Sequence, residues 1–174
     1  MAEQEKNHLK EIITTLAEDG VRFIICGGVA LVLHGIERMT MDIDLAIDMT
    51  APNLRKFLAA MKKLKLNPRA PVPAESLLDP EQRRVFIEEK NALVFTFIDT
   101  SNPFRQVDIF LTEELSFNAL KGGAEQLAIS GHTVKLLSKK KLLELKRSIT
   151  PLRDKDIFDI QALEKLLREE GNRS

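Results

Sequence analysis

The chain has 174 residues, which fits one domain of ordinary size, and 44% of them are hydrophobic, as in a water-soluble globular protein. The 26 Lys and Arg residues balance the 26 Asp and Glu residues, so bulk charge gives no reason to expect a nucleic-acid-binding protein. Cys26 is the only cysteine, which excludes an intramolecular disulfide, and the lack of Tyr and Trp argues against base stacking on several aromatic side chains.

Hydrophobic spacing separates the expected helices from the expected strands. Leu9, Ile12, Ile13 and Leu16 repeat at helical spacing, whereas residues 41–48 alternate polar and apolar. In the first half of the chain we expect a helix ending at Gly20, a strand over 21–26, a short helix over 29–35, a strand over 41–48, and a helix that starts with Thr50 as cap and Pro52 in its first turn. After it we expect a loop over 67–73, a helix capped by Asp79, and strands over 93–98 and 104–111. The chain then ends with a hairpin over 127–137 and helices over 139–148 and 154–169. The pattern predicts a single α+β domain over 1–174, a mixed sheet flanked by helices, with a helical tail over about 138–170.

No signal-peptide pattern precedes the acidic start of the chain, so we expect a cytoplasmic protein. The longest apolar run, from Phe23 to Leu33, is interrupted by Gly27-Gly28 and is too short to cross a bilayer. We therefore expect no membrane partner.

A Gly27-Gly28 pair follows the first predicted strand and precedes a predicted helix. Glycine lets a backbone approach a ligand closely, and a helix N-terminus offers unpaired N–H groups to a phosphate. A plain turn is the competing interpretation, and it is the commoner one for an isolated pair.

The next strand carries Asp42-Ile43-Asp44, which places two carboxylates on one face. Mg²⁺ prefers oxygen ligands and is usually held by one or two carboxylates together with substrate phosphates. An acidic stripe facing solvent is the alternative, although Asp is a poor strand former and two of them in an Ile/Leu run call for a reason.

Asp108 stands alone between apolar neighbours in a later predicted strand, where the pattern indicates a partly buried face. A buried carboxylate needs a cation or a set of hydrogen-bond donors. A salt bridge with Arg105 or Lys90 is the structural alternative to a metal ion.

These motifs in combination resemble the nucleotidyltransferase superfamily that includes DNA polymerase β. Thirteen residues separate Gly27-Gly28 from Asp42-Ile43-Asp44-Leu45, and a lone strand Asp follows at 108. The stretch from Arg38 through Thr40 to Leu45 is similar to small bacterial members, including minimal, abortive-infection and toxin–antitoxin nucleotidyltransferases and some antibiotic nucleotidyltransferases. The resemblance covers about residues 7 to 166.

The resemblance implies an enzyme of the EC 2.7.7 type that moves a nucleoside monophosphate from a nucleoside triphosphate to an acceptor. By analogy, Asp42, Asp44 and Asp108 hold two Mg²⁺ ions, which steady the attacking and leaving oxygens of an in-line displacement. Gly27 and Gly28 then hold the triphosphate. Arg38 and Thr40 either contact the triphosphate or pair with nearby acids and the loop backbone.

A charged cluster near the C-terminus also resembles the toxin-like members. It comprises Lys146 and the segment Arg153-Asp154-Lys155-Asp156, followed by Asp159. Pro151 should end the preceding helix and let the next one fold back towards the Asp strand. We expect Lys146 to reach the triphosphate and Asp156 to orient Lys146 or a neighbouring basic group, against the alternative of exposed ion pairs between two surface helices. The roles of Arg153, Lys155 and Asp159 are left open.

Other polar residues fit structural roles better than chemical ones. His34 ends a short helix, Asp48 ends the acidic strand where a turn or capping role is expected, and Cys26 is expected to be a small core residue. Lys139-Lys140-Lys141 opens a helix and is either a solvated surface or a phosphate-binding edge.

The sequence does not identify the acceptor, which could be a tRNA 3′ end, a protein side chain or a small molecule. Competing classes are a non-catalytic antitoxin or regulatory partner of the same fold and a metal-dependent phosphohydrolase or nuclease. Three converging acids argue against the first, and the poor placement of the three His residues argues against the second. The oligomeric state is left open, with a homodimer as one alternative.

Overall fold

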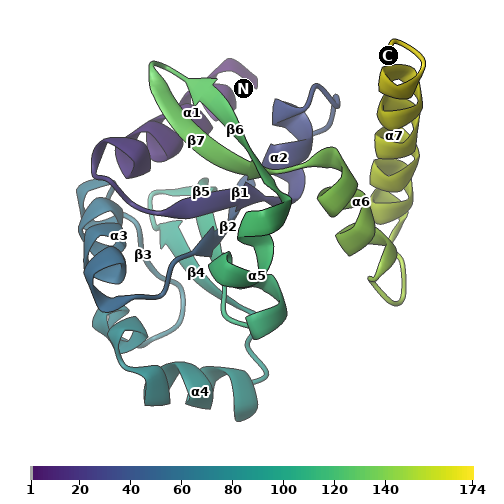
Figure 1. Cartoon of the computed structure of the whole chain (residues 1–174). Coiled ribbons are helices and arrows are strands. Elements are labelled where there is room, and N and C mark those ends of the chain that lie inside the picture. The colour runs from purple at the N-terminus through teal and green to yellow at the C-terminus, as the bar shows by residue number, and fades with distance from the viewer. Residues whose placement is uncertain (1) are drawn as a thin grey trace.

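A seven-stranded mixed sheet forms the centre of the protein (Figure 1). The computed structural model describes residues 2–174, with side chains from His8 onward. In spatial order the strands are β3 (Asn67–Pro68), β4 (Val94–Asp99), β5 (Asn102–Phe110), β2 (Asp42–Ile47), β1 (Phe23–Cys26), β7 (His132–Leu137) and β6 (Ala124–Ile129). The helices are α1 (Ala2–Glu18), α2 (Gly27–Leu33), α3 (Ala51–Lys63), α4 (Pro80–Glu88), α5 (Phe117–Leu120), α6 (Lys139–Arg147) and α7 (Asp154–Gly171), with short 3₁₀ segments η1 (Ala74–Leu78), η2 (Glu113–Leu115) and η3 (Lys121–Gly123). The predicted α+β class is confirmed.

The central strands combine parallel and antiparallel pairing, and their register brings the acidic positions together. β2 runs antiparallel to β1 and parallel to β5. Asp44 lies opposite Cys26 on one side and opposite Asp108 on the other. Because side chains of directly opposed residues share one face of a sheet, Asp44 and Asp108 project into the same space.

Helices surround this sheet on several sides (Figure 1). α1 contacts α3 and the strands β5 and β7, and α5 contacts β1 and β2. α2 packs on β1 and β2 and also touches α6, which in turn packs against α7. In Figure 1 the α6–α7 pair lies beyond α2, away from α3. The turn from β1 into α2 therefore faces the C-terminal helices.

The core fixes the position of the acidic strand. Ile43 and Leu45, which alternate with the acids of β2, are completely buried. On α3 and β4, Phe57 and Phe97 pack edge to face with ring centroids 5.4 Å apart. Each such side chain contributes about 1.5–3 kcal/mol by burial, so a shift of β2 by one residue would be very costly.

Three local expectations were wrong. α2 begins at Gly27 rather than at residue 29, because glycine accepts the positive φ of 58° found there. Within the expected loop over 67–73, Asn67 and Pro68 pair with β4, which an edge position allows because Pro need not donate there. Thr50 precedes α3 but its side chain makes no capping hydrogen bond; its N–H is instead bound by the Asp48 carboxylate, 3.1 Å away.

Elsewhere the expected caps and boundaries hold to within a few residues. The Asp79 carboxylate accepts a hydrogen bond from the Glu81 N–H, and the Ser138 hydroxyl accepts one from the Lys141 N–H. The segment 113–123, for which we had no expectation, forms η2, α5 and η3. Within the described residues, no helix has the length and apolar character needed to cross a membrane.

Candidate active site

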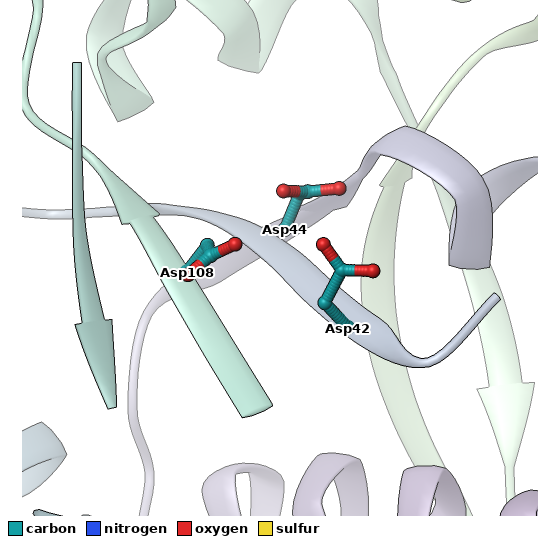
Figure 2. Close-up of side chains that lie close together, drawn as sticks. All are labelled: Asp42, Asp44 and Asp108. Carbon is teal, nitrogen blue, oxygen red and sulfur yellow. The ribbon is translucent and has the colours of Figure 1, made fainter. Parts of the chain in front are cut away.

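Three carboxylates from two neighbouring strands converge at one point of the sheet (Figure 2). Asp42 and Asp44 alternate along β2, and Asp108 lies on β5 directly opposite Asp44. One oxygen atom from each carboxylate lies within 4.8 Å of the other two. The convergence expected from the sequence is thus present, in a geometry that a pair of small divalent cations could occupy.

The electrostatics of this cluster favour a bound cation. Burial, together with the negative charges of Asp42 and Asp108, raises the pKa of Asp44 from 3.8 to about 7, while Lys146 and Lys155 act in the opposite direction. Like charges held this close resist joint ionisation unless a cation compensates them. The residues present therefore fit a hard divalent metal ion by both donor type and charge.

Asp108 is held by neutral donors rather than by a salt bridge. Its Oδ1 accepts a hydrogen bond from the Thr96 hydroxyl at 2.6 Å, and the Gln106 amide nitrogen lies 3.2 Å from Oδ1 and 3.0 Å from Oδ2. Asp108 is only 7% exposed. The alternative of an Arg105 salt bridge is wrong, because Arg105 pairs with Asp99 and Glu11. Lys90 is likewise not its partner among the described ion pairs.

The two glycines bring the backbone against the carboxylate cluster. A Cβ atom added to Gly27 would lie 2.0 Å from Oδ2 of Asp44, and one added to Gly28 would lie 2.7 Å from the Thr40 hydroxyl oxygen. The positive φ of Gly27 disfavours a side chain for a second reason. The pair is therefore more than turn punctuation, since only glycine allows the first turn of α2 to approach the acids this closely.

Arg38 and Thr40, in the segment before β2, make different contacts. Arg38 Nη1 lies 2.6 Å from Oδ2 of Asp159 on α7, and the Arg38 side chain is largely buried. The Thr40 hydroxyl lies against Gly28 and 3.4 Å from the Asp42 carbonyl oxygen. Arg38 thus ties the segment before β2 to the C-terminal helix, and its pairing with an acid is one of the two alternatives that the sequence left open.

Lys146 occupies the centre of a buried charge network between α6 and α7. Its Nζ lies 2.9 Å from Oδ1 of Asp156 and 2.9 Å from Oδ2 of Asp159, and both acids are at most 1% exposed. Arg153 Nε bonds Oδ2 of Asp156 at 2.6 Å. Hydrogen bonds from Arg153 and Lys146 lower the pKa of Asp156 well below its usual range.

The alternative of exposed ion pairs between two surface helices is wrong for this network, because its two carboxylates, Asp156 and Asp159, are buried. The second oxygen of Asp159, Oδ1, is buried without a hydrogen-bond partner among the described residues. Such networks are costly to break, since removal of one member leaves another charge unpaired. The second helix does fold back as predicted, and Lys146 lies near enough to affect the Asp44 carboxyl.

A cavity of about 280 Å³ connects the two halves of the site. Its lining includes Gly27 and Asp44 from the sheet side and Lys146 and Arg153 from the helical side. Apolar side chains complete the wall: Phe110, Leu115, Leu137, Leu142, Leu145 and Ile149. The cavity therefore combines an acidic edge, a basic edge and an apolar wall beside the start of α2.

The remaining polar residues have structural partners. His34 Nε2 lies 2.8 Å from the Leu137 carbonyl oxygen, which ties the end of α2 to β7. Asp48 pairs with Arg22 and accepts a hydrogen bond from the Thr50 N–H two residues later, which confirms the turn role of the two that were expected, a turn or a cap. Cys26 is buried, and burial strongly raises the pKa of its thiol, as expected of a core cysteine.

Two of the three consecutive lysines at the start of α6 are paired with acids. Lys139 lies 2.7 Å from Glu170 and Lys141 lies 2.8 Å from Glu144. These contacts offset the unfavourable charge at the helix N-terminus. They favour the interpretation as a solvated surface over a phosphate-binding edge.

Solved structures with the same architecture are nucleotidyltransferases, although they share little sequence with this chain. The antibiotic-resistance factor ANT(2″)-Ia matches with a TM-score of 0.62 at 15% identity, over 96% of this chain and 86% of its own. The lincosamide antibiotic adenylyltransferase LnuA, bound to lincomycin, matches with a TM-score of 0.60 at 17% identity, over 91% and 95%. An antigenic nucleotidyltransferase-like protein from Paracoccidioides brasiliensis matches with a TM-score of 0.56 at 19% identity, over 93% and 78%.

These likenesses establish the fold, and no curated protein sequence matches the chain. The family is established by the sequence itself, because the model of the family described as "Nucleotidyl transferase AbiEii toxin, Type IV TA system" matches residues 12–172. That span includes the acidic strands, the glycine pair and the buried C-terminal network together. The chain therefore belongs to the AbiEii family of nucleotidyltransferase toxins of type IV toxin–antitoxin systems.

Proposed function

We propose that this protein transfers a nucleoside monophosphate from a nucleoside triphosphate to an acceptor hydroxyl, using Mg²⁺ held by Asp42, Asp44 and Asp108. The observation that carries the proposal is the convergence of these three carboxylates within 4.8 Å, with the pKa of Asp44 raised to about 7 by burial and by its acidic neighbours. When bound, two such ions neutralise developing charge on the reacting phosphate. A structural role alone gives no physical reason to hold three acids together.

The triphosphate binds, in this proposal, between the start of α2 and the Lys146 side of the site. Gly27 and Gly28 let the first turn of α2 lie directly against Asp44 and Thr40, and the free N–H groups of that turn would bind phosphate oxygens beside the acids. Lys146 and Arg153 supply positive charge from the other wall of the 280 Å³ cavity. Asp156 holds Lys146 in place, which is the role expected of it.

Arg38 and Thr40 complete the nucleotide side of the proposal. Arg38 binds Asp159 through Nη1 and the Met39 carbonyl through Nε, which leaves Nη2 for a phosphate oxygen as far as the described residues show. The hydroxyl of Thr40, next to Gly28, lies at the same edge. Both residues would then orient the triphosphate rather than take part in proton transfer.

The acceptor hydroxyl approaches from the side of Asp108. In an in-line displacement, the attacking oxygen and the leaving pyrophosphate lie on opposite sides of the α-phosphate. With the pyrophosphate beside α2, the attacking oxygen lies towards β5 and β4. The carboxylate of Asp108 is the acceptor for the proton of that hydroxyl in this arrangement.

The chemical class of the acceptor is proposed from the family. ANT(2″)-Ia has been solved with adenylyl-2″-tobramycin and LnuA with lincomycin, so this fold accepts small antibiotics in those proteins. A toxin of a toxin–antitoxin system acts on its own cell, which favours a cellular acceptor such as a tRNA 3′ end or a protein side chain. The family assignment also disfavours the alternative of a non-catalytic antitoxin.

The test is incubation with Mg²⁺ and each α-³²P-labelled nucleoside triphosphate, in separate reactions with bulk tRNA, with cellular protein, and with tobramycin or lincomycin. Pyrophosphate release coupled to label on one acceptor is expected, and Asp44→Asn should abolish both. Label transfer that persists in Asp44→Asn, or metal-independent transfer by the wild type, would refute the assignment of the site. Glu89→Gln, which removes an exposed carboxylate at the C-terminal end of α4, is the matched control.

A further inference from the structure

A series of hydrogen-bonded side chains connects Asp108, through Gln106, to Arg69 next to the edge strand β3. Thr96 on β4 lies directly opposite Asp108 and donates to its Oδ1, while Gln106 precedes Asp108 by two residues and faces the same way. The Gln106 amide nitrogen contacts both carboxylate oxygens. Together these donors restrict the rotation of the carboxylate, which a single contact would leave free.

Arg69 holds the other end of the Gln106 amide. Its Nη2 lies 3.0 Å from Oε1 of Gln106, so the amide oxygen faces the guanidinium and the amide nitrogen faces Asp108. Both partners thus select the same orientation of a group that could otherwise rotate by 180°. The reverse orientation would place Oε1 against the Asp108 carboxylate and repel it.

The backbone places Arg69 where it can do this. Asn67 and Pro68 pair with β4, and the Arg69 N–H then donates to the Thr96 carbonyl oxygen at 2.9 Å. Gln106 lies opposite Ile98 on one side and opposite Asp42 on the other. The Arg69 side chain therefore reaches across β4 to a residue that neighbours two of the three acids, Asp42 on β2 and Asp108 on the same strand.

We propose that Gln106, held in orientation by Arg69, is a positioning residue that presents the Asp108 carboxylate to the divalent metal. The Thr96 hydroxyl adds a second donor to Oδ1 of the same carboxylate. The inference rests on the proposed metal site and adds to it the residues that orient its third ligand. Removal of such outer partners of metal ligands typically weakens metal binding or activity by about 10–100-fold.

Gln106 and Arg69 should contribute unequally to metal binding, and Arg69 should act only through Gln106. Gln106 contacts the ligand directly and is partly buried, whereas Arg69 is exposed and acts only through the amide. We expect Gln106→Ala to raise the dissociation constant for Mn²⁺ about tenfold and Arg69→Ala about threefold. The double variant should be no weaker than Gln106→Ala, because Arg69 has no path to Asp108 once the amide is gone.

The experiment measures free Mn²⁺ by electron paramagnetic resonance during titration of the full-length protein without nucleotide. Arg69→Lys, which retains a donor, should bind Mn²⁺ nearly as tightly as the wild type. Gln126→Ala on the exposed face of β6 and Arg84→Ala on α4 are the matched controls and should not change binding. Melting temperatures should stay within about 3 °C of the wild type, which separates positioning from a general loss of stability.

A second readout comes from the transfer reaction. Gln106→Ala should lower kcat while the KM for the nucleoside triphosphate stays near the wild-type value, because the triphosphate lies on the α2 side of the acids. Unchanged Mn²⁺ affinity in Gln106→Ala, or additive losses in the double variant, would overturn the inference while leaving the metal site intact. A wild-type protein that binds no Mn²⁺ would overturn the proposed metal site and this inference with it.

Discussion

The apo protein should be stabilised when Asp44 loses its charge, and the effect should depend on pH. Asp44→Asn removes a carboxyl whose pKa is raised from 3.8 to about 7 by burial and by the neighbouring Asp42 and Asp108. For a carboxyl raised in this way, the folded state retains a proton that the unfolded chain releases between about pH 4 and pH 7. Its contribution to stability is thus present below pH 4 and is lost as the pH rises to 7.

The magnitude follows from the same shift. An increase of the pKa from 3.8 to about 7 corresponds to about 4 kcal/mol of preference for the neutral form, at about 1.4 kcal/mol per pH unit. The raised pKa already includes the opposing attraction of Lys146 and Lys155, but Asn still buries a polar amide in place of the neutral carboxyl, so we expect roughly half of this to appear. At pH 8 without metal, Asp44→Asn should be about 2 kcal/mol more stable than the wild type, or about 6 °C in melting temperature.

The assay is urea unfolding from pH 4.5 to 8.5 in the presence of EDTA, with Glu89→Gln as the control for loss of an exposed carboxylate. The stability difference between Asp44→Asn and the wild type should shrink towards zero as the pH falls to 4.5. Saturating Mg²⁺ at pH 8 should stabilise the wild type and not the variant. A difference that does not vary with pH, or a variant less stable than the wild type at pH 8, would refute the electrostatic reasoning.

Three further predictions test other parts of the site. Gly27→Ala should destabilise the protein by about 2 kcal/mol or more and weaken Mg²⁺ binding, because the new Cβ would meet Oδ2 of Asp44 and the φ of residue 27 is positive. Urea unfolding measures the stability and a metal titration measures the binding, and a variant that is as stable and binds Mg²⁺ as well as the wild type would contradict the geometry. Lys146→Ala should lower stability by about 3 kcal/mol, since two buried acids lose a partner, and should also slow transfer per folded molecule at least tenfold. Exposed Lys140→Ala is its control, and normal turnover per folded molecule would assign Lys146 a structural role only. Mg²⁺ together with a nucleoside triphosphate should raise the melting temperature by more than the sum of their separate effects, whereas strictly additive shifts in a thermal scan would argue against a shared site.

Local patterns in the sequence were enough to identify the acids and glycines of the site. The alternation through Asp42, Ile43 and Asp44 predicted a strand with both carboxylates on one face, because side chains of a strand alternate by geometry alone. Gly27-Gly28 at the end of an apolar strand indicated a close backbone approach, and the structure identifies Asp44 as the group approached. Asp108 between apolar neighbours indicated a buried carboxylate in need of partners.

The partners themselves depended on the tertiary structure. Arg38 meets Asp159 across 121 residues, and Gln106 is held by Arg69 from a segment whose three prolines favoured a loop. Such pairs are set by which strands lie side by side and by how the helices pack, and the periodicity of a single sequence indicates which face of an element is buried but not which element it meets. The segment 113–123 was equally hidden, because helices of three or four residues are too short to show a hydrophobic period. The sequence by itself thus determined which groups carry charge on which face, whereas only the folded sheet decided which donor meets which acid.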